Sequence, residues 1–259
     1  MFIKKNKKLV IVISLMFVLG TTGLWWAKEN KNWIFADGIP ILMYHAIGDP
    51  PNGTDKKMTG WYVSKEKFKE QMEYLKKNDY DFISFDELKN AKRYKKPVIV
   101  TFDDGYENNM IAYKILNELK DSKFKPKVTL FMISSLIDQP NYLNQNQLKQ
   151  LSQSEIFSIQ SHTGSHINLM DSTVDFQLEY EETNKKISKI TEKNVYILSY
   201  PFGAFNDESL NQAKKYYKYA VAMGHDRFKL QDEKDELYKI KRLTISGHDS
   251  IWKFILMVR

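Results

Sequence analysis

The chain has 259 residues, of which 42% are hydrophobic and 27% charged, a balance that is typical of a globular protein and excludes a disordered one. Its net charge of +7 comes from lysines scattered along helix-like segments, and no nucleic-acid-binding motif is present, so we expect a solvated basic surface and no nucleic-acid partner. The absence of cysteine excludes disulfides, thiolate metal sites and cysteine nucleophiles, so any metal must be held by His, Asp and Glu.

The N-terminus has the pattern of a signal peptide or a membrane anchor. Residues 1–8 contain four lysines, and residues 9–26 are uncharged and end in Trp25 and Trp26. The length of this run and its aromatic end favour an uncleaved anchor helix, with residues 1–8 in the cytoplasm. We therefore expect a linker at 27–38 and a single extracytoplasmic domain at 39–259, either membrane-anchored or, if the segment is cleaved, secreted.

Strand-like and helix-like segments alternate along the rest of the chain, without an internal repeat. The predicted strands lie at 39–45, 81–85, 96–102, 127–133, 157–162, 195–201, 219–224 and 238–246, and the predicted helices at 64–78, 108–121, 144–153, 175–191, 207–217 and 250–258. Such alternation predicts an α/β fold with a mainly parallel sheet and crossover helices. About seven strands favour a closed or nearly closed barrel.

The stretch VTFDDGYENN, residues 100–109, places two acids where a buried strand ends. Adjacent side chains of a strand point to opposite faces, so a continued strand would bury one carboxylate unpaired, which is costly. We therefore expect Asp103 and Asp104 to lie in a loop with separate tasks. Gly105 would let that loop turn tightly with a substrate close by.

Other polar motifs also fall at predicted strand ends. His45 ends the strand at 39–45, His162 and His166 follow the strand at 157–162, and YPFG (200–203) ends the strand at 195–201. Alone, Asp-Asp-Gly and YPFG are typical of turns, and a His-x-x-x-His pair is a weak metal signal that often arises by chance. All of them fall on the carboxyl edge of the sheet, where active sites of such folds form. Two histidines and one carboxylate suit a divalent metal with open positions, while the second aspartate can accept a proton from a water that the metal acidifies.

The motifs TFDDG, SHTGSH and YPFG together resemble those of the NodB-type polysaccharide deacetylases, carbohydrate esterase family four, over roughly residues 39–247. The resemblance implies a distorted parallel (β/α) barrel, the NodB homology domain, and metal-assisted removal of acetyl groups from extracellular sugars. It also implies that Asp103 is the general base and that Asp104, His162 and His166 bind one divalent metal. Zinc is the expected metal, with cobalt, nickel or iron as alternatives.

The third motif departs from the family pattern, because the arginine that usually precedes a Pro-Tyr pair is missing and Phe202 replaces the tyrosine. The backbone N–H of Phe202 can still act as the oxyanion donor, since this role needs no side chain. Arg242, on a late strand, is a candidate to orient Asp103 in place of the missing arginine.

The general acid has two candidates. The strand ILMYHAIG resembles the opening strand of the poly-β-1,6-N-acetylglucosamine deacetylases of biofilm matrices, which implies that His45 is the acid. His248, in ISGHDS, is the fallback. The alternative for His45 is a buried histidine that is satisfied by the backbone.

Three aromatic residues are candidates for stacking on sugar rings: Trp61, Tyr62 and Tyr200. The alternative for the first two is that they pack their loop onto the following helix.

The sequence thus predicts a membrane-associated, metal-dependent N-deacetylase of an extracellular N-acetylglucosamine polymer, with β-1,6 linkage favoured and no protein partner expected. The alternatives are the same chemistry on peptidoglycan or chitin oligomers, and an inactive carbohydrate-binding relative. The complete set of metal ligands and base argues against the inactive relative.

Overall fold

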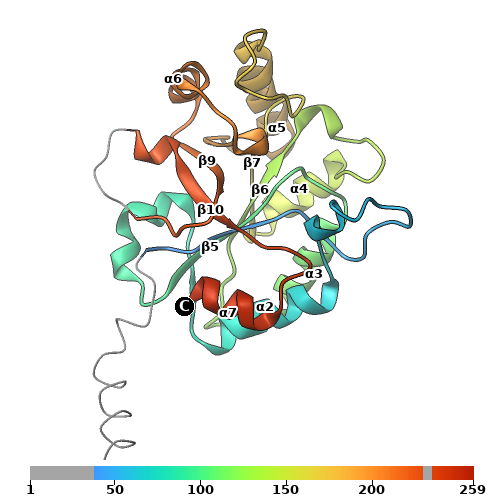
Figure 1. Ribbon diagram of the computed structural model, residues 1–259, viewed down its shortest axis with the longest axis vertical. Coiled ribbons are helices and arrows are strands. Elements are labelled where there is room, and N and C mark those ends of the chain that lie inside the picture. Colours follow the sequence, from blue (N-terminus) through green and yellow to red (C-terminus); the bar gives the residue numbers. More distant parts are fainter. Residues whose placement is uncertain (1–37, 230–234) are drawn as a thin grey trace, which may run out of the picture. The chain divides into compact units, whose positions relative to one another are not determined.

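The computed structural model describes residues 38–229 and 235–259 (Figure 1). The predicted segments 1–8 and 9–26, and all but the last residue of the predicted linker, lie outside the described residues. Within the described ranges, no helix is long and apolar enough to cross a membrane. Gly38–Val258 form one compact unit.

Seven parallel strands close into a barrel, which confirms the predicted architecture. The order is β1-β10-β9-β8-β7-β6-β5, and β5 pairs back with β1 to complete the ring. A short strand, β4, pairs with the beginning of β5, whereas β6 pairs with its later residues. The bounds are β1 Ile41–Tyr44, β4 Asp81–Phe82, β5 Pro97–Phe102, β6 Val128–Met132, β7 Phe157–Ser161, β8 Ile197–Ser199, β9 Tyr219–Gly224 and β10 Ile240–Thr244.

Alternate residues of β5 show how the barrel directs polar groups inward. Val98 and Val100 pack in the hydrophobic layer between the barrel and its helices, whereas Ile99 belongs to a separate cluster of inward-facing residues. Thr101 and Asp103 continue the inward-facing row, because strand side chains alternate with a period of two. The interior is therefore apolar at one end and polar where the strands finish.

Helices cover the outside of the barrel. Figure 1 shows α2, α3 and α7 together on one side, with α5 and α6 on another. Ser64 begins α2 as predicted, since its side chain accepts a hydrogen bond from the Lys67 N–H. The bounds are α2 Lys65–Lys77, α3 Asn109–Leu119, α4 Gln145–Gln153, α5 Thr183–Thr191, α6 Asp207–Tyr216 and α7 Ile251–Val258.

Several segments differ from the sequence prediction. The strand predicted at 81–85 ends at Phe82, because Ser84 and Glu87 form a capping box that begins a 3₁₀ helix, Phe85–Arg93. The helix predicted at 175–191 is divided into a π-helix, Gln177–Glu182, and α5. Two unpredicted short strands, β2 (Ala46–Ile47) and β3 (Tyr62–Val63), pair with each other in parallel.

Candidate active site

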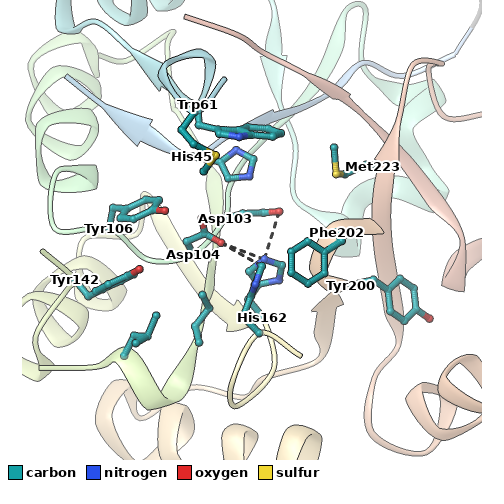
Figure 2. A pocket seen from close by; sticks show the side chains of 14 residues that line it. His45, Trp61, Asp103, Asp104, Tyr106, Tyr142, His162, Tyr200, Phe202 and Met223 are labelled. Carbon is teal, nitrogen blue, oxygen red and sulfur yellow. Dashed lines mark ion pairs between the residues drawn. The ribbon is translucent and has the colours of Figure 1, made fainter. Parts of the chain in front are cut away.

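A cavity of about 410 Å³ opens where the barrel strands end (Figure 2). It collects predicted site residues from strand ends that are far apart in the sequence, as expected for the carboxyl edge of a barrel. Its lining residues are His45, Met58, Trp61, Asp103, Asp104, Tyr106, Ile133, Leu136, Tyr142, His162, His166, Tyr200, Phe202 and Met223.

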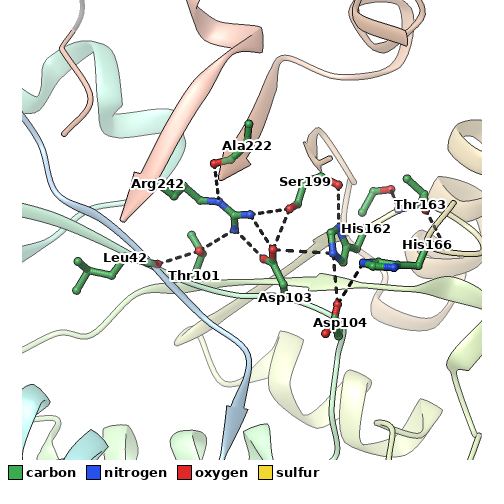
Figure 3. Close-up of polar contacts among 11 residues, drawn as sticks. Leu42, Thr101, Asp103, Asp104, His162, Thr163, His166, Ser199, Ala222 and Arg242 are labelled. Atoms are coloured by element: carbon green, nitrogen blue, oxygen red, sulfur yellow. Dashed lines mark hydrogen bonds and ion pairs between the residues drawn. The ribbon is translucent and has the colours of Figure 1, made fainter. Parts of the chain in front are cut away.

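Asp103 is held by Arg242 through both carboxylate oxygens. The guanidinium Nη1 and Nη2 donate to Oδ1 and Oδ2 at 2.7 Å each, and Ser199 Oγ donates to Oδ2 at 3.1 Å (Figure 3). Arg242 is fully buried, and Nη1 also donates to Thr101 Oγ1 at 3.0 Å. Burial by itself would raise the pKa of Asp103, but the positive charge and hydrogen bonds of Arg242 hold it well below its usual value. Arg242 thus contacts Asp103 from β10, and Ser199, at the end of β8, directly precedes the third motif.

Asp104 faces two histidine rings. Its Oδ1 lies 3.4 Å from His162 Nε2 and 3.7 Å from His166 Nε2 (Figure 3). One ligand atom from each of the three residues lies within 4.8 Å of the others. The sequence-predicted ligands are therefore brought together.

The donor set fits a divalent metal. His162 Nδ1 lies 2.8 Å from the Ser199 carbonyl oxygen, which can only accept, so Nδ1 carries a proton and Nε2 is the ring nitrogen that is left to bind a metal. Metal-binding histidines are typically held in this way by a hydrogen bond at the other ring nitrogen. The N₂O set leaves positions for water and substrate, as the chemistry of a catalytic divalent ion requires.

The backbone of the site is strained at the residues that carry these groups. Asp104, Thr163, His166 and Phe202 all have positive φ values, of 71°, 66°, 58° and 59°. Such values are uncommon for residues with a Cβ and persist only where the surroundings impose them. At Asp104 this conformation turns the chain out of the direction of β5.

Gly105 makes the tight turn expected after the two aspartates, with a φ of +81°. A Cβ at this position would overlap the Met132 sulfur, so packing against β6 is a further reason for glycine here.

His45 lines the cavity beside Trp61, and their ring centroids are 4.3 Å apart (Figure 2). His45 Nδ1 is buried and, among the described residues, has no hydrogen-bond partner, which does not support the alternative of a histidine satisfied by the backbone. Burial lowers the pKa of His45, and Asp103 and Asp104 oppose this effect. His248 is exposed, lies 3.2 Å from Thr59 Oγ1 through Nε2 and does not line the cavity.

Of the other predicted site residues, Phe202 and Tyr200 line the cavity and Tyr62 does not. Phe202 is 62% exposed, and its ring packs on His166 with centroids 4.6 Å apart. Among the turn, loop and cap hydrogen bonds of the described residues, none engages the Phe202 N–H. Tyr200 lines the cavity but stacks on Phe205, and its side chain points away from the histidines (Figure 2). Tyr62 lies outside the cavity, on β3.

Two further aromatic residues, Tyr106 and Tyr142, line the cavity and were not predicted from the sequence. Tyr106 and Tyr142 stack with centroids 5.2 Å apart, and Tyr106 also hydrogen-bonds Asp104. Burial, together with the charge of Asp104, raises the pKa of Tyr106, so its phenol stays protonated and can donate to Asp104. The place of Tyr106 directly after Asp-Asp-Gly was an available signal, whereas nothing in the sequence pairs it with Tyr142.

Known proteins share this fold and these motifs. Residues 90–221 match the family model described as polysaccharide deacetylase. YxkH of Bacillus subtilis is 34% identical over 197 residues, which are 73% of this chain and 64% of that protein, so the chain spans less than two thirds of that relative's length. A poly-beta-1,6-N-acetyl-D-glucosamine N-deacetylase of Staphylococcus aureus is 26% identical and is covered to 83%, with 82% of this chain aligned. The crystal structure of BC0361, a polysaccharide deacetylase from Bacillus cereus, superimposes with a TM-score of 0.81 at 36% identity, covering 87% of this chain and 70% of that one.

Proposed function

The chain belongs to the polysaccharide deacetylase family, and we propose that it is a metal-dependent hydrolase that removes N-acetyl groups from an extracellular poly-N-acetylglucosamine with β-1,6 linkages. The observation that carries the proposal is the convergence of two differently held carboxylates. Asp103 is paired with Arg242, while Asp104 faces His162 and His166. One acid is thus free of the ligand set, as a general base must be.

In this proposal Asp104, His162 and His166 hold the divalent ion, with zinc as the expected metal. When bound, such an ion polarises the acetyl carbonyl and acidifies water. Asp103 accepts a proton from the attacking water, and the Phe202 N–H donates to the developing oxyanion. The C–N bond then breaks as His45 donates a proton to the departing nitrogen, which leaves acetate and a free amine.

The choice of substrate rests on the relatives and on the site. Named poly-β-1,6-N-acetylglucosamine deacetylases align with 82% of this chain. Trp61 and the Tyr106–Tyr142 pair offer aromatic faces suited to the apolar faces of sugar rings. The second candidate is the same reaction on peptidoglycan or chitin oligomers, which would use the same base and ligands.

We further propose that the enzyme acts outside the cytoplasm and is attached to the membrane through residues 9–26. The support is the uncharged run that follows four lysines in the sequence. Fractionation of cells that express the full chain would test this, since an anchored protein stays with membranes after a high-salt wash and a secreted one appears in the medium.

Acetate release from defined polymers tests the substrate. The full chain, loaded with zinc, would be given β-1,6-linked N-acetylglucosamine oligomers, chitin oligomers and peptidoglycan in parallel. We expect release from the β-1,6 oligomers at the highest kcat/KM. Release from peptidoglycan or chitin alone would support the second candidate and contradict the first.

A further inference from the structure

Glu179 is a buried carboxylate that the proposed reaction does not use. It is 4% exposed and lies in the π-helix Gln177–Glu182. Within the described chain, its carboxylate accepts hydrogen bonds from the loop that joins His162 to His166. Oε2 accepts from the Gly164 N–H at 2.8 Å and the Ser165 N–H at 2.9 Å, and Oε1 accepts from Ser165 Oγ at 2.6 Å.

We propose that Glu179 is a positioning residue for the metal centre, which holds the 163–165 loop so that His166 reaches Asp104 and His162. The inference rests on the proposed function, because it assumes that these three residues bind the metal. Partners that orient metal ligands from outside the ligand set commonly contribute tenfold to hundredfold to metal affinity.

The 163–165 loop needs the hydrogen bonds of Glu179 because the backbone around it is strained. Thr163 and His166, at its two ends, have φ values of 66° and 58°. The other side of the loop is fixed by backbone bonds, from Ser134 N–H to the Thr163 carbonyl and from Ser135 N–H to the Gly164 carbonyl. The N–H groups of Gly164 and Ser165 take no part in this pairing, and the Glu179 carboxylate accepts their hydrogen bonds. Without them, the strained conformation would lose one of its supports.

A carboxylate suits this place better than a neutral group. Two successive N–H groups converge on a single oxygen, as in the anion-binding nests formed by backbone amides. No ion pair involves Glu179 among the described residues, so the donors of the loop compensate its buried charge. The fit is also close, since a Cβ on Gly164 would lie 3.2 Å from Glu179 Oε2.

The π-helix places a second contact beside the first. Thr183, which follows the π-helix at the start of α5, exchanges a hydrogen bond with Ser134 Oγ at 2.9 Å. Lys186 donates to the Ser134 carbonyl at 2.7 Å. Glu179, Thr183 and Lys186 therefore form one helix face directed at the loops beside the metal ligands. π-Helical turns are often found at functional sites, which agrees with this arrangement.

Metal affinity tests the proposal without any polymer substrate. Glu179→Met keeps the length of the side chain and removes both acceptor oxygens, and with them all three hydrogen bonds. Glu182→Met is the matched control on an exposed position of the same helix. Co²⁺ affinity would be measured on the full chain by competition with a chromophoric chelator, and the visible absorption of bound Co²⁺ would report ligand geometry. We expect Glu179→Met to bind Co²⁺ about 10–100 times more weakly, with an altered spectrum, and Glu182→Met to match the native chain.

Conservative variants separate positioning from general stability. Glu179→Gln keeps an oxygen for the two N–H groups but loses the negative charge, and its amide can donate to Ser165 Oγ, so we expect a metal affinity between those of Glu179→Met and the native chain. If Glu179→Met does not fold, Ser165→Ala removes one of the three bonds, and a smaller loss in the same direction is expected.

The outcomes are distinct. Native affinity and spectrum in Glu179→Met, or a Glu179→Gln variant as impaired as Glu179→Met, would overturn the role of Glu179 and leave the proposed function intact. A native chain that binds metal but releases no acetate would contradict the proposed function, and the affinity comparison would still decide the role of Glu179. A native chain that binds no metal would overturn both.

Discussion

Asp103 and Asp104 are neighbours in the chain, yet their surroundings give them different chemistry. Arg242 contacts both oxygens of Asp103 inside the barrel, whereas Asp104 turns out of the strand with φ +71° and faces two histidines. Both carboxylates have a pKa below the usual value although burial opposes this, and cationic neighbours are the cause for Asp103. Asp103 is therefore kept ionised, which a proton acceptor requires.

Replacement of Arg242 tests this account of Asp103. Arg242→Met leaves the buried carboxylate unpaired, so burial then dominates and the pKa of Asp103 rises. Because the ionised form is the base, the acid limb of the pH–rate profile should move to higher pH. The free energy of unfolding should fall by about 3–5 kcal/mol.

Arg242→Lys is the control, because it keeps the positive charge and loses the two-pronged contact. We expect it to shift the acid limb less than Arg242→Met does. Acetate release between pH 4 and 9 and urea unfolding measure the two effects. An acid limb that stays in place in Arg242→Met would show that Arg242 does not set the ionisation of Asp103.

Substitution of the two candidate general acids, His45 and His248, should affect activity very differently. His45 lines the cavity and His248 does not, so His45→Gln should lower kcat about 10²–10⁴-fold and His248→Gln should leave it within twofold. An acid must be protonated to act, so native activity should fall as pH rises through the pKa of His45, and His45→Gln should lack this alkaline limb. The reverse pattern would make His248 the acid.

At the scale of elements, the sequence predicted which segments are strands and that the chemical groups follow them. Short runs of β-branched residues predict strands, and a strand that is buried on both faces is apolar along most of its length. Residues 98–100, VIV, are such a run in the strand that ends just before Asp103. The segment at 81–85 was harder, because FISF has strand propensity but Ser84 and Glu87 form a capping box that ends it. Capping depends on side-chain hydrogen bonds, and hydrophobic periodicity does not report them.

The 3₁₀ helix at 85–93 should depend on Glu87. Burial would raise the pKa of Glu87, but hydrogen bonds from Ser84, Tyr94 and Lys127 lower it to about 2. The folded-state pKa is thus below the unfolded value of 4.5, so this stabilisation is present above about pH 4.5 and is lost as pH falls toward 2. Glu87→Gln should lower the free energy of unfolding by about 1 kcal/mol at pH 7 and by less at pH 3.

Urea unfolding at the two pH values checks this expectation. Glu118→Gln, an exposed position on α3, is the control and should change little at either pH. An equal loss at pH 7 and pH 3 in Glu87→Gln would contradict the assigned ionisation.

At the scale of the whole molecule, closure of the barrel creates the site. β1 lies between β10 and β5, so Arg242 and Asp103, which are 139 positions apart, meet across the interior. The sequence identified Arg242, on a late strand, as a candidate partner of Asp103, but it could not give the strand order that brings the two together, because strand order is set by long-range packing. For the same reason Glu179 and the Tyr106–Tyr142 pair were not recognised, since their partners come from other elements.

Metal should stabilise the whole molecule if it binds the folded site alone. Dialysis of the full chain against a chelator should lower the melting temperature, and zinc should restore it in a concentration-dependent way. At a hundredfold excess over Kd the expected gain is about 2.7 kcal/mol. His166→Gln should lose most of this response, and an equal response in the variant would place the metal elsewhere.

The most direct test of the central claim is acetate release by the native full chain and by Asp103→Asn, with bound metal measured in both. Asparagine keeps the shape of the side chain but cannot accept the proton from water. The account predicts metal-dependent acetate release by the native protein, and a loss of about 10²–10⁴-fold in Asp103→Asn with metal content unchanged. Equal release by the two proteins at equal metal content would contradict it.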